Sequence, residues 1–256
     1  MAYRLALLNQ KGGVGKTTVA INVAGALAAR GNDVLFVDLD PQGHGTEGPG
    51  LADAYDAAPP SLFDVLLDLD SRSLINELVH EHEEFDVVPS NVDMFSAEPK
   101  LTTAMRSRER FGMALDELDR DYDFVVVDCP PSLGNLTDNA LLACRNLLIP
   151  ALAEGTSVRA LEILFDQVDA LQQGYGVEID DVGLVANRVE TDGEATETRA
   201  WFEDIFGGRI PAWEVRKRVA RKRAWNEGAS IFTHREDCDM EDAFPHSAAH
   251  LEEVAG

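Results

Sequence analysis

The sequence has only three cysteines and no long apolar run, and both shortages exclude classes of protein. Cys129, Cys144 and Cys238 form no C-x-x-C pair, which argues against a disulfide framework and against a zinc or iron–sulfur site. The longest apolar region, residues 140–153, is interrupted by Arg145, so no membrane span is expected. Residues 3–8 are apolar over too short a distance for a signal peptide. We therefore expect a cytoplasmic protein whose cysteines are thiols in its core.

Lysine is also scarce, and the balance of charge is strongly acidic. Only five residues are lysine, whereas 46 are Asp or Glu, and the formal net charge is −24. A surface of strongly hydrated carboxylates keeps a protein soluble in very salty cytoplasm. This composition favours a halophilic archaeon as the source, and an acidic soluble protein of ordinary salt is the alternative. The 256 residues and 45% hydrophobic content suit one large domain.

Against this background, residues 9–18 stand out because they read N-Q-K-G-G-V-G-K-T-T. Glycines allow backbone N–H groups to close around phosphate oxygens, and a helix that starts near Thr17 directs its positive dipole end at the same anion. Lys16 would reach the β- and γ-phosphates, and the Thr17 hydroxyl would ligate Mg²⁺. A glycine-rich turn without a ligand is the alternative. The residues expected to contact the nucleotide are Lys11, Gly12, Gly13, Val14, Gly15, Lys16, Thr17 and Thr18.

This loop departs from the general phosphate-loop pattern, G-x-x-x-x-G-K-S/T, in an informative way. Gln10 stands where the first glycine is expected, and an additional lysine, Lys11, follows it. The resulting K-G-G-V-G-K-T-T resembles the deviant Walker A box of the ParA/MinD superfamily. In that superfamily the extra lysine reaches the nucleotide of a partner subunit, so the resemblance implies a homodimer with ATP between its subunits.

The chain alternates between short apolar runs and helical patterns. This alternation predicts an α/β fold, a doubly wound and mostly parallel sheet flanked by helices, in a single domain over residues 1–256. Strands are expected at residues 3–9, 32–39, 85–90, 124–127, 147–150 and 182–187. Helices are expected at residues 17–30, 71–80, 106–120 and 157–172, with an amphipathic segment at 61–67 and a surface loop at 42–60.

Three aspartates follow two of the expected strands. Asp38 and Asp40 lie in V-D-L-D-P-Q-G, and Asp128 opens D-C-P-P-S-L-G after four apolar residues. Both stretches resemble the corresponding boxes of ParA/Soj partition ATPases. The resemblance implies that Asp128 holds Mg²⁺ opposite Thr17, that Asp38 supports the Mg²⁺ shell, and that Asp40 orients the attacking water, so Lys11, Lys16 and Asp40 are the catalytic candidates. Turn capping before Pro41 is the alternative for Asp38 and Asp40.

Two further stretches resemble the base-contacting parts of the superfamily. Asn187 and Arg188 follow an expected strand, and an amide can hydrogen-bond the adenine edge with one donor and one acceptor. Pro211 matches the second base-contacting loop, but Trp213 stands where partition ATPases often carry Asn, so stacking on the base stays open there. A turn residue at a strand end is the alternative for Asn187.

A basic run contrasts with the rest of the chain, because residues 216–223 contain six basic residues and no acid. If the run is helical, four of its side chains form one stripe suited to DNA phosphates. A solvated helix face is the alternative. The candidate DNA contacts are Arg216, Lys217, Arg218, Arg221, Lys222 and Arg223.

These patterns predict an ATPase that uses ATP and Mg²⁺, dimerises, binds double-stranded DNA nonspecifically and partitions a chromosome or plasmid. By the same resemblance a ParB-like partner stimulates hydrolysis, and the protein is associated with the nucleoid. A MinD-like membrane-bound positioning ATPase is the main alternative, but it needs a basic amphipathic helix at the C-terminus, where this chain is acidic. Positioning of a protein cargo on the nucleoid is another alternative. His246 and His250 are expected to be exposed rather than metal ligands.

Overall fold

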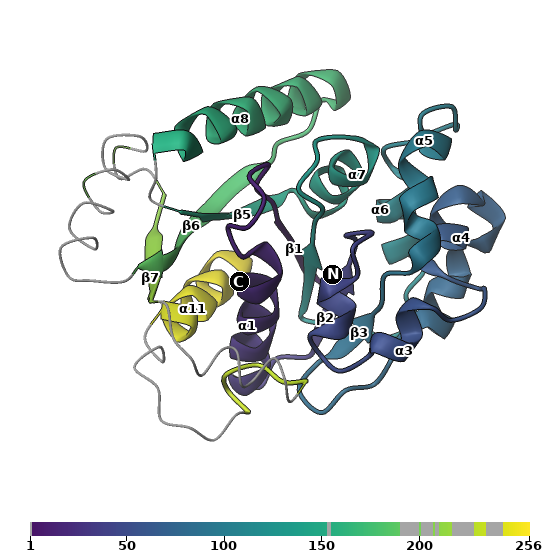
Figure 1. Ribbon diagram of the computed structural model, residues 1–256, viewed down its shortest axis with the longest axis horizontal. Helices are drawn as coiled ribbons and strands as arrows, with labels where there is room; N and C mark the ends of the chain where they lie inside the picture. Colours follow the sequence, from purple (N-terminus) through teal and green to yellow (C-terminus); the bar gives the residue numbers. More distant parts are fainter. Residues whose placement is uncertain are drawn as a thin grey trace.

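Seven parallel strands form one sheet in the order β3-β2-β4-β1-β5-β6-β7 (Figure 1). This architecture, given by a computed structural model, confirms the predicted α/β fold. The structure describes residues 2–152, 155–189, 200, 207, 210–216, 228–233 and 243–256. The strands are β1 (Tyr3–Leu7), β2 (Val34–Asp38), β3 (Asp86–Val88), β4 (Phe124–Asp128), β5 (Asn146–Ala151), β6 (Asp180–Val189) and β7 (Ala212–Arg216).

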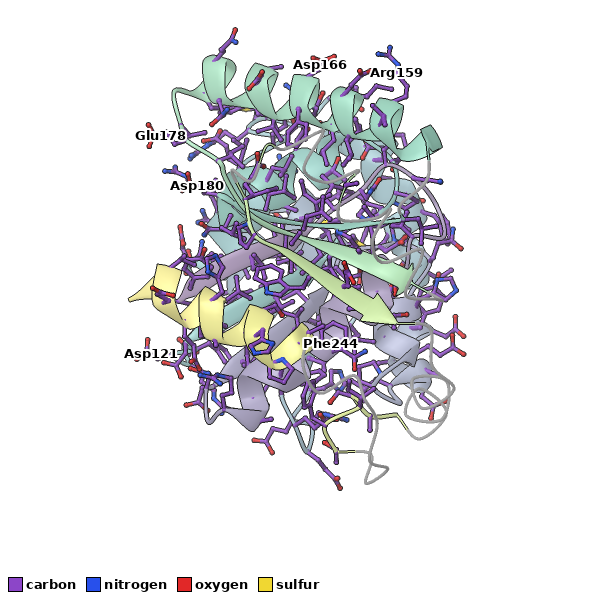
Figure 2. All side chains as sticks on the ribbon, turned by 90° about the vertical axis from the view of Figure 1, so that its left-hand side faces the viewer. Asp121, Arg159, Asp166, Glu178, Asp180 and Phe244 are labelled. Carbon is purple, nitrogen blue, oxygen red and sulfur yellow. The ribbon has the colours of Figure 1, made fainter. Side chains whose placement is uncertain are left out.

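Helices cover both faces of the sheet, which explains why successive residues of the central strands are mostly apolar. In β2, Leu35 and Val37 pack into one hydrophobic cluster, and Val34 and Phe36 pack into another on the opposite face. Figure 2 shows α8 and α11 on opposite sides of the strands. One face carries α1 (Lys16–Ala29) and α11 (Ala243–Ala255), and the other carries α4 (Leu62–Leu67), α5 (Ala97–Leu101), α6 (Arg110–Leu115), α7 (Asn135–Cys144) and α8 (Gly155–Tyr175).

The helix predicted at residues 106–120 is wrong in its length, since only α6, Arg110–Leu115, is helical there. Arg106 has a φ of 53°, which a right-handed helix cannot contain. Asp116, Glu117 and Asp119 would fall at the carboxyl end of the helix, where the helix dipole disfavours acids. The negative charges that follow Leu115 therefore favour an end of α6 at that residue.

Two other local predictions need correction. Residues 71–80 lie mostly in a 3₁₀ segment, η1 (Leu69–Leu78), rather than an α-helix. There the Asn76 side chain donates to the carbonyl of Ser73, so side chains compete with the regular helical bonds. The loop predicted at residues 42–60 contains two one-turn helices, α2 (His44–Glu47) and α3 (Ala52–Tyr55). The sequence patterns also missed η2 (Val92–Ser96), α5, α7, β7 and α11.

Candidate functional site

The glycine-rich loop joins the carboxyl end of β1 to the first turn of α1. Gly13 and Gly15 have φ values of 76° and 85°, in the left-handed region that glycine occupies without strain. Gly15 is the N-cap of α1, so the free N–H groups of the helix point into the loop. A Cβ atom added at Gly12 or Gly13 would meet nothing within 4 Å. The loop therefore leaves open space beside its backbone, as a phosphate requires.

Two buried amide side chains, one in the loop and one in β6, tie this loop to distant strands. The Asn9 Nδ2 donates to the carbonyl of Pro150 at 2.7 Å, and the Asn9 Oδ1 accepts from the Lys11 backbone N–H at 2.9 Å. From β6, the Asn187 Nδ2 donates to the carbonyl of Val14 at 2.8 Å. The loop conformation thus depends on β5 and β6 as well as on its own glycines.

The Lys16 side chain is buried beside two carboxylates. Burial lowers the pKa of the Lys16 ammonium, and the negative charges of Asp128 and Asp40 oppose that shift. The Lys16 ammonium therefore lies close enough to Asp128 and Asp40 for their charges to act on it, and both residues were predicted to take part in the reaction. An ammonium in this position can neutralise phosphate charge in a site of low dielectric.

Asp38 and Asp128 lie opposite each other at the carboxyl ends of adjacent strands β2 and β4. Both are fully buried. Burial, with the negative charge of Asp40 adding to it, raises the pKa of Asp128 to about 7, although the Thr17 hydroxyl lowers it in part. Neither carboxyl oxygen of Asp128 has a hydrogen-bond partner of normal geometry. Buried carboxyl oxygens with so few donors suit a cation site, so Asp128 and the nearby Thr17 hydroxyl fit Mg²⁺.

Asp38 differs from Asp128 because its carboxylate is already occupied. One oxygen accepts from the backbone N–H of Asp40 at 3.1 Å, and the other accepts from the backbone N–H and the hydroxyl of Thr46 at 2.7 and 2.8 Å. The Thr46 hydroxyl in turn accepts from the Ser90 N–H at 2.8 Å. Asp38 therefore fixes the start of α2 to β2 and β3, and its predicted place in the Mg²⁺ shell stays a prediction.

Asp40 lies two residues beyond β2 on the same edge of the sheet. One of its oxygens accepts from the Gln42 backbone N–H at 3.0 Å, which orients the carboxylate. Burial raises the pKa of Asp40, whereas the Gln42 bond and the charge of Lys16 hold it down. The geometry is suited to holding a water molecule, and the predicted catalytic role stays a prediction.

No group of three or more His, Cys, Asp or Glu residues in the described part of the chain could hold a metal ion by itself. Magnesium in phosphoryl-transfer sites is bound through one or two protein groups together with substrate phosphates. The arrangement at Asp128 therefore suits a metal that arrives with a nucleotide. His246 is exposed, as expected, whereas His250 is partly buried with its ring 5.5 Å from that of Trp213.

The residues predicted to contact the base make structural contacts of their own. Asn187 is buried and bound to Val14, and its adenine contact stays a prediction. The backbone carbonyl of Pro211 accepts from the Leu184 N–H at 2.9 Å, which fixes the start of β7. A Cβ atom at Gly183 would overlap the Trp213 ring, so this ring is packed on the sheet. That packing accounts for Trp213 without a base stacked on it.

Several predicted residues lie outside the described part of the chain. Lys217, Arg218, Arg221, Lys222 and Arg223 are among them. Arg188 and Arg216 belong to β6 and β7, but their side chains are not described either. The backbone places Arg216 at the end of a strand, so the basic run starts in β7 rather than in a helix.

Thr46 and Ser90 are site residues that the sequence patterns did not identify. Each is polar and fully buried, and both support Asp38. Gly45 is the residue in the sequence that could have indicated this part of the site. A Cβ atom at that position would lie 2.7 Å from the Asp38 carboxyl carbon, so only glycine fits there. A glycine next to a small hydroxyl residue, directly after an acidic box, indicates close backbone approach to a carboxylate.

Comparison with known proteins identifies relatives over most of the chain. The protein-family description "AAA domain" matches residues 3–180. The chain is 38% identical over 215 residues to the chromosome partitioning protein ParA of Myxococcus xanthus, covering 81% of this chain and 74% of that protein. It is 36% identical over 180 residues to the sporulation initiation inhibitor protein Soj of Bacillus subtilis, covering 70% of each chain.

A solved structure with bound nucleotide is also similar. This is the cobyrinic acid a,c-diamide synthase of Mycobacterium smegmatis with bound ADP and magnesium. The TM-score is 0.76 at 31% identity, and the match covers 89% of this chain and 92% of that one. The relative therefore contains the same pair, an adenine nucleotide and magnesium, that the phosphate loop and Asp128 of this chain are shaped to take.

Proposed function

Because the chain belongs to the ParA/Soj family of ATPases, we propose that it partitions a chromosome or a plasmid. It hydrolyses ATP, and Mg²⁺ is its cofactor. The proposal has three parts that go beyond ATP hydrolysis. ATP joins two copies of the chain into a dimer, the dimer binds duplex DNA without sequence preference on the nucleoid, and a ParB-like partner stimulates hydrolysis to release it.

The site residues divide the chemistry among them. Lys16 and the backbone of the glycine loop bind the β- and γ-phosphates, and Asp128 with Thr17 holds the cation. When bound, Mg²⁺ neutralises charge that develops on the phosphates. Asp40, oriented by the Gln42 N–H, holds the attacking water in line. Phosphoryl transfer needs positioning more than a strong base, so a single oriented carboxylate is sufficient for this step.

The observation that carries the DNA-binding part is the basic run at residues 216–223. Six basic residues without an acid stand in a chain of net charge −24. The run begins at the carboxyl end of β7. Since all strands are parallel, that end of β7 lies on the same edge of the sheet as the glycine loop. Nucleotide and DNA would therefore be bound along one edge of the protein.

The chain beyond the run is attached to the nucleotide-binding half of the molecule. The Ile231 N–H donates to the Asn22 side chain of α1 at 3.1 Å. A Cβ atom at Gly228 would lie 3.2 Å from the backbone of Gly50, which follows α2. Residues 228–231, which follow the run in the sequence, therefore contact α1 and the loop after α2. These contacts supply a route by which the nucleotide can affect DNA binding.

The MinD-like alternative requires a free amphipathic helix for the membrane. The helix α11 instead uses its apolar side to pack on the protein, with Phe244, Ala248 and Leu251 buried in the cluster that also contains residues of α1. Arg30, which directly follows α1, pairs with Glu252 of α11 at 2.6 Å. No helix in the described part of the chain is long and apolar enough to cross a bilayer. These contacts support the DNA-partition proposal over membrane binding.

Duplex binding tests the proposal. The parent and the triple variant Arg218→Ala, Arg221→Ala, Lys222→Ala are titrated with DNA in ATP and in ADP over a salt series. We expect the parent to bind only with ATP, because two basic runs on one duplex multiply the phosphate contacts. The triple variant should still dimerise with ATP but should lose DNA binding and the steep dependence of log affinity on log salt.

A matched control removes the same charges elsewhere. The triple variant Arg72→Ala, Lys100→Ala, Arg159→Ala also loses two arginines and one lysine, all in the described part of the chain. It should bind DNA as the parent does. If both triple variants bind equally to the parent, residues 216–223 are not the DNA site.

A further inference from the structure

Tyr55 ends the short helix α3 and reaches the turn that carries Asp40. Its hydroxyl donates to the carbonyl of Pro41 at 2.6 Å. Its ring covers Gly43, where an added Cβ atom would overlap the ring carbons. Tyr55 is not among the residues proposed to bind ATP, Mg²⁺ or DNA, yet both of its contacts are with residues that follow β2 at the nucleotide edge of the sheet. These contacts therefore need an explanation of their own.

Residues 40–43 form a β-turn. The Gly43 N–H donates to the Asp40 carbonyl at 3.0 Å, which closes the turn. Pro41 stands at the second position of the turn, where the fixed φ of proline fits. The Asp40 side chain accepts from the Gln42 N–H at 3.0 Å, as aspartate commonly does at the first position of a turn. The carboxylate that is proposed to hold the attacking water is thus oriented by a backbone N–H of its own turn.

This N–H belongs to the same peptide group as the carbonyl that Tyr55 binds. A peptide group is planar, so the Gln42 N–H and the Pro41 carbonyl must rotate together. Turns of types I and II differ by rotation of this central peptide, so the bond that closes the turn does not by itself fix the direction of the N–H. Tyr55 holds the oxygen of the peptide, and Asp40 accepts from its N–H. A fixed carbonyl therefore fixes the donor that orients the Asp40 carboxylate.

The helix α3 is itself tied to the site on both sides of Tyr55. At its start, the Leu51 N–H donates to the carbonyl of Thr46 at 3.1 Å. Beyond its end, the Ala57 carbonyl accepts from the buried Asn91 side chain, also at 3.1 Å. The hydroxyl is thus held in place before ATP arrives. Groups that are positioned in advance do not have to be ordered during the reaction.

The Tyr55 hydroxyl also keeps the proton that it donates. Burial raises the pKa of this hydroxyl, and the negative charges of Asp56, Asp38 and Asp40 raise it further. Loss of the proton would remove the only hydrogen with which a tyrosine side chain can donate. The carboxylates of the site therefore preserve the bond to the Pro41 carbonyl at neutral pH.

We propose that Tyr55 is a positioning residue for ATP hydrolysis, which orients the Asp40 carboxylate through the peptide between Pro41 and Gln42. The proposal rests on the role proposed for Asp40. The Tyr55 hydroxyl is engaged by the Pro41 carbonyl, so it acts through the turn and not on the phosphates. Loss of the hydroxyl should therefore slow hydrolysis and leave the affinity for the nucleotide unchanged.

Steady-state hydrolysis by the full chain tests this with Tyr55→Phe, which keeps the ring over Gly43 and removes only the hydroxyl. We expect kcat to fall about fivefold, as for the loss of one hydrogen bond, with KM for ATP within about twofold of the parent. In calorimetry the affinity for Mg-ADP should be unchanged. The affinity for Mg-ADP with fluoroaluminate, which mimics the transition state, should fall by the same factor as kcat.

Two results would overturn the positioning role. One is a turnover by Tyr55→Phe equal to that of the parent. The other is an equal loss of affinity for Mg-ADP with and without fluoroaluminate, because such a loss would mean that the phosphate loop itself has been disturbed.

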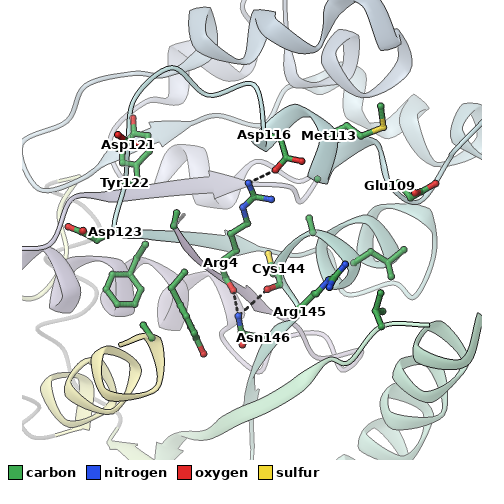
Figure 3. Close-up of a pocket in the computed structure, with 18 of the residues that line it drawn as sticks. Arg4, Glu109, Met113, Asp116, Asp121, Tyr122, Asp123, Cys144, Arg145 and Asn146 are labelled. Carbon is green, nitrogen blue, oxygen red and sulfur yellow. Dashed lines mark hydrogen bonds and ion pairs between the residues drawn. The ribbon is translucent and has the colours of Figure 1, made fainter. Parts of the chain in front are cut away.

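Tyr122→Phe is the matched control. Tyr122 lies just before β4, at the opposite edge of the sheet from the glycine loop (Figure 3). Its hydroxyl donates to the Asp86 carboxylate at 2.8 Å. The variant therefore also loses one hydrogen bond from a tyrosine hydroxyl, and it should hydrolyse ATP as the parent does. A fall in kcat equal to that of Tyr55→Phe would show that any such loss slows the enzyme, and the proposal would be wrong.

Asp40→Ala distinguishes failure of this inference from failure of the role on which it rests. Turnover equal to that of the parent in Asp40→Ala would overturn the role proposed for Asp40, and the positioning role of Tyr55 with it. Loss of turnover in Asp40→Ala, together with unchanged turnover in Tyr55→Phe, would overturn the positioning role alone.

Discussion

The side-chain amide of Asn187 donates to the carbonyl of Val14, 173 positions earlier in the sequence, at a distance of 2.8 Å. This bond joins β6 to the glycine loop, and a Cβ atom at Gly15 would overlap the same amide. The strand end that resembles a base-contacting element therefore also shapes the phosphate-binding loop. The two roles predict different effects of mutation.

We predict that Asn187→Ala weakens binding of ATP and of inorganic tripolyphosphate by the same factor, on the order of tenfold. The loss of the bond to Val14 frees the loop that both ligands use. Fluorescence competition or calorimetry with the two ligands measures this, and Gln173→Ala, at an exposed amide side chain of α8, serves as a control. A loss confined to ATP would show that Asn187 acts on the adenine and not through the loop.

Asp128 should make the metal-free protein less stable as the pH rises. Its pKa is about 7 in the folded chain and about 3.9 in an unfolded one, so the native state binds the extra proton between these values. The free energy of unfolding in EDTA should therefore fall across this window, at up to about 1.4 kcal/mol per pH unit, and level off above pH 7. Asp128→Asn should remove this contribution and be more stable than the parent at pH 8.

Urea unfolding at several pH values in EDTA gives the comparison. The difference between the parent and Asp128→Asn reports Asp128 together with Asp38 and Lys16, because the charge of Asp128 also raises the pKa of those two groups. Saturating Mg-ADP should flatten the difference for the parent, because a bound cation favours the ionised carboxylate. Parallel stability curves for the two proteins in EDTA would contradict the raised pKa.

Thr46 should matter for stability through its hydroxyl and not through its size. Thr46→Val leaves the Ser90 N–H without an acceptor and removes a donor from Asp38, all in a buried site. We expect a loss of about 2–4 kcal/mol in the free energy of unfolding. Thr46→Ser keeps the hydroxyl and should stay within about 1 kcal/mol of the parent. Equal stability of the valine and serine variants would exclude the hydrogen bonds as the cause.

Lys11→Ala should separate dimerisation from nucleotide binding. The Lys11 backbone N–H is bound to Asn9, so the loop should keep its shape when the side chain is removed. The monomer should bind ATP through Lys16 with nearly unchanged affinity, whereas light scattering with a nonhydrolysable ATP analogue should show no dimer. The control is Lys16→Ala, which should lose the nucleotide itself. A variant that dimerises as the parent does would limit Lys11 to a local role.

The parts of the site that could be predicted from the sequence are those made of neighbouring residues. The glycine loop, Lys16 and the strand that ends at Asp128 each occupy a few consecutive positions, and their spacing reflects a single strand, turn or helix. The family assignment, the parallel sheet and the use of ATP and Mg²⁺ are confirmed. The halophilic source and the individual roles of Asp38 and Asp40 stay predictions.

The interactions that could not be predicted join residues far apart in the chain. No local pattern indicates that Asn187 binds Val14, or that Ser90 and Thr46 support Asp38. The helix expected at residues 106–120 failed for a different reason, because Arg106 has a positive φ and the acids after Leu115 oppose the helix dipole. Periodicity detects a buried face, whereas termination depends on capping and charge.

The position of β1 in the sheet imposes an order on synthesis and folding. This strand is made before both of its partners, β4 and β5, whose residues begin at positions 124 and 146. During translation the glycine loop must remain without its supporting strands until more than half of the chain has been made, and without Asn187 for longer still. Such nonlocal pairing slows folding and exposes apolar segments. We therefore expect the nascent chain to bind ATP tightly only after β6 has emerged from the ribosome.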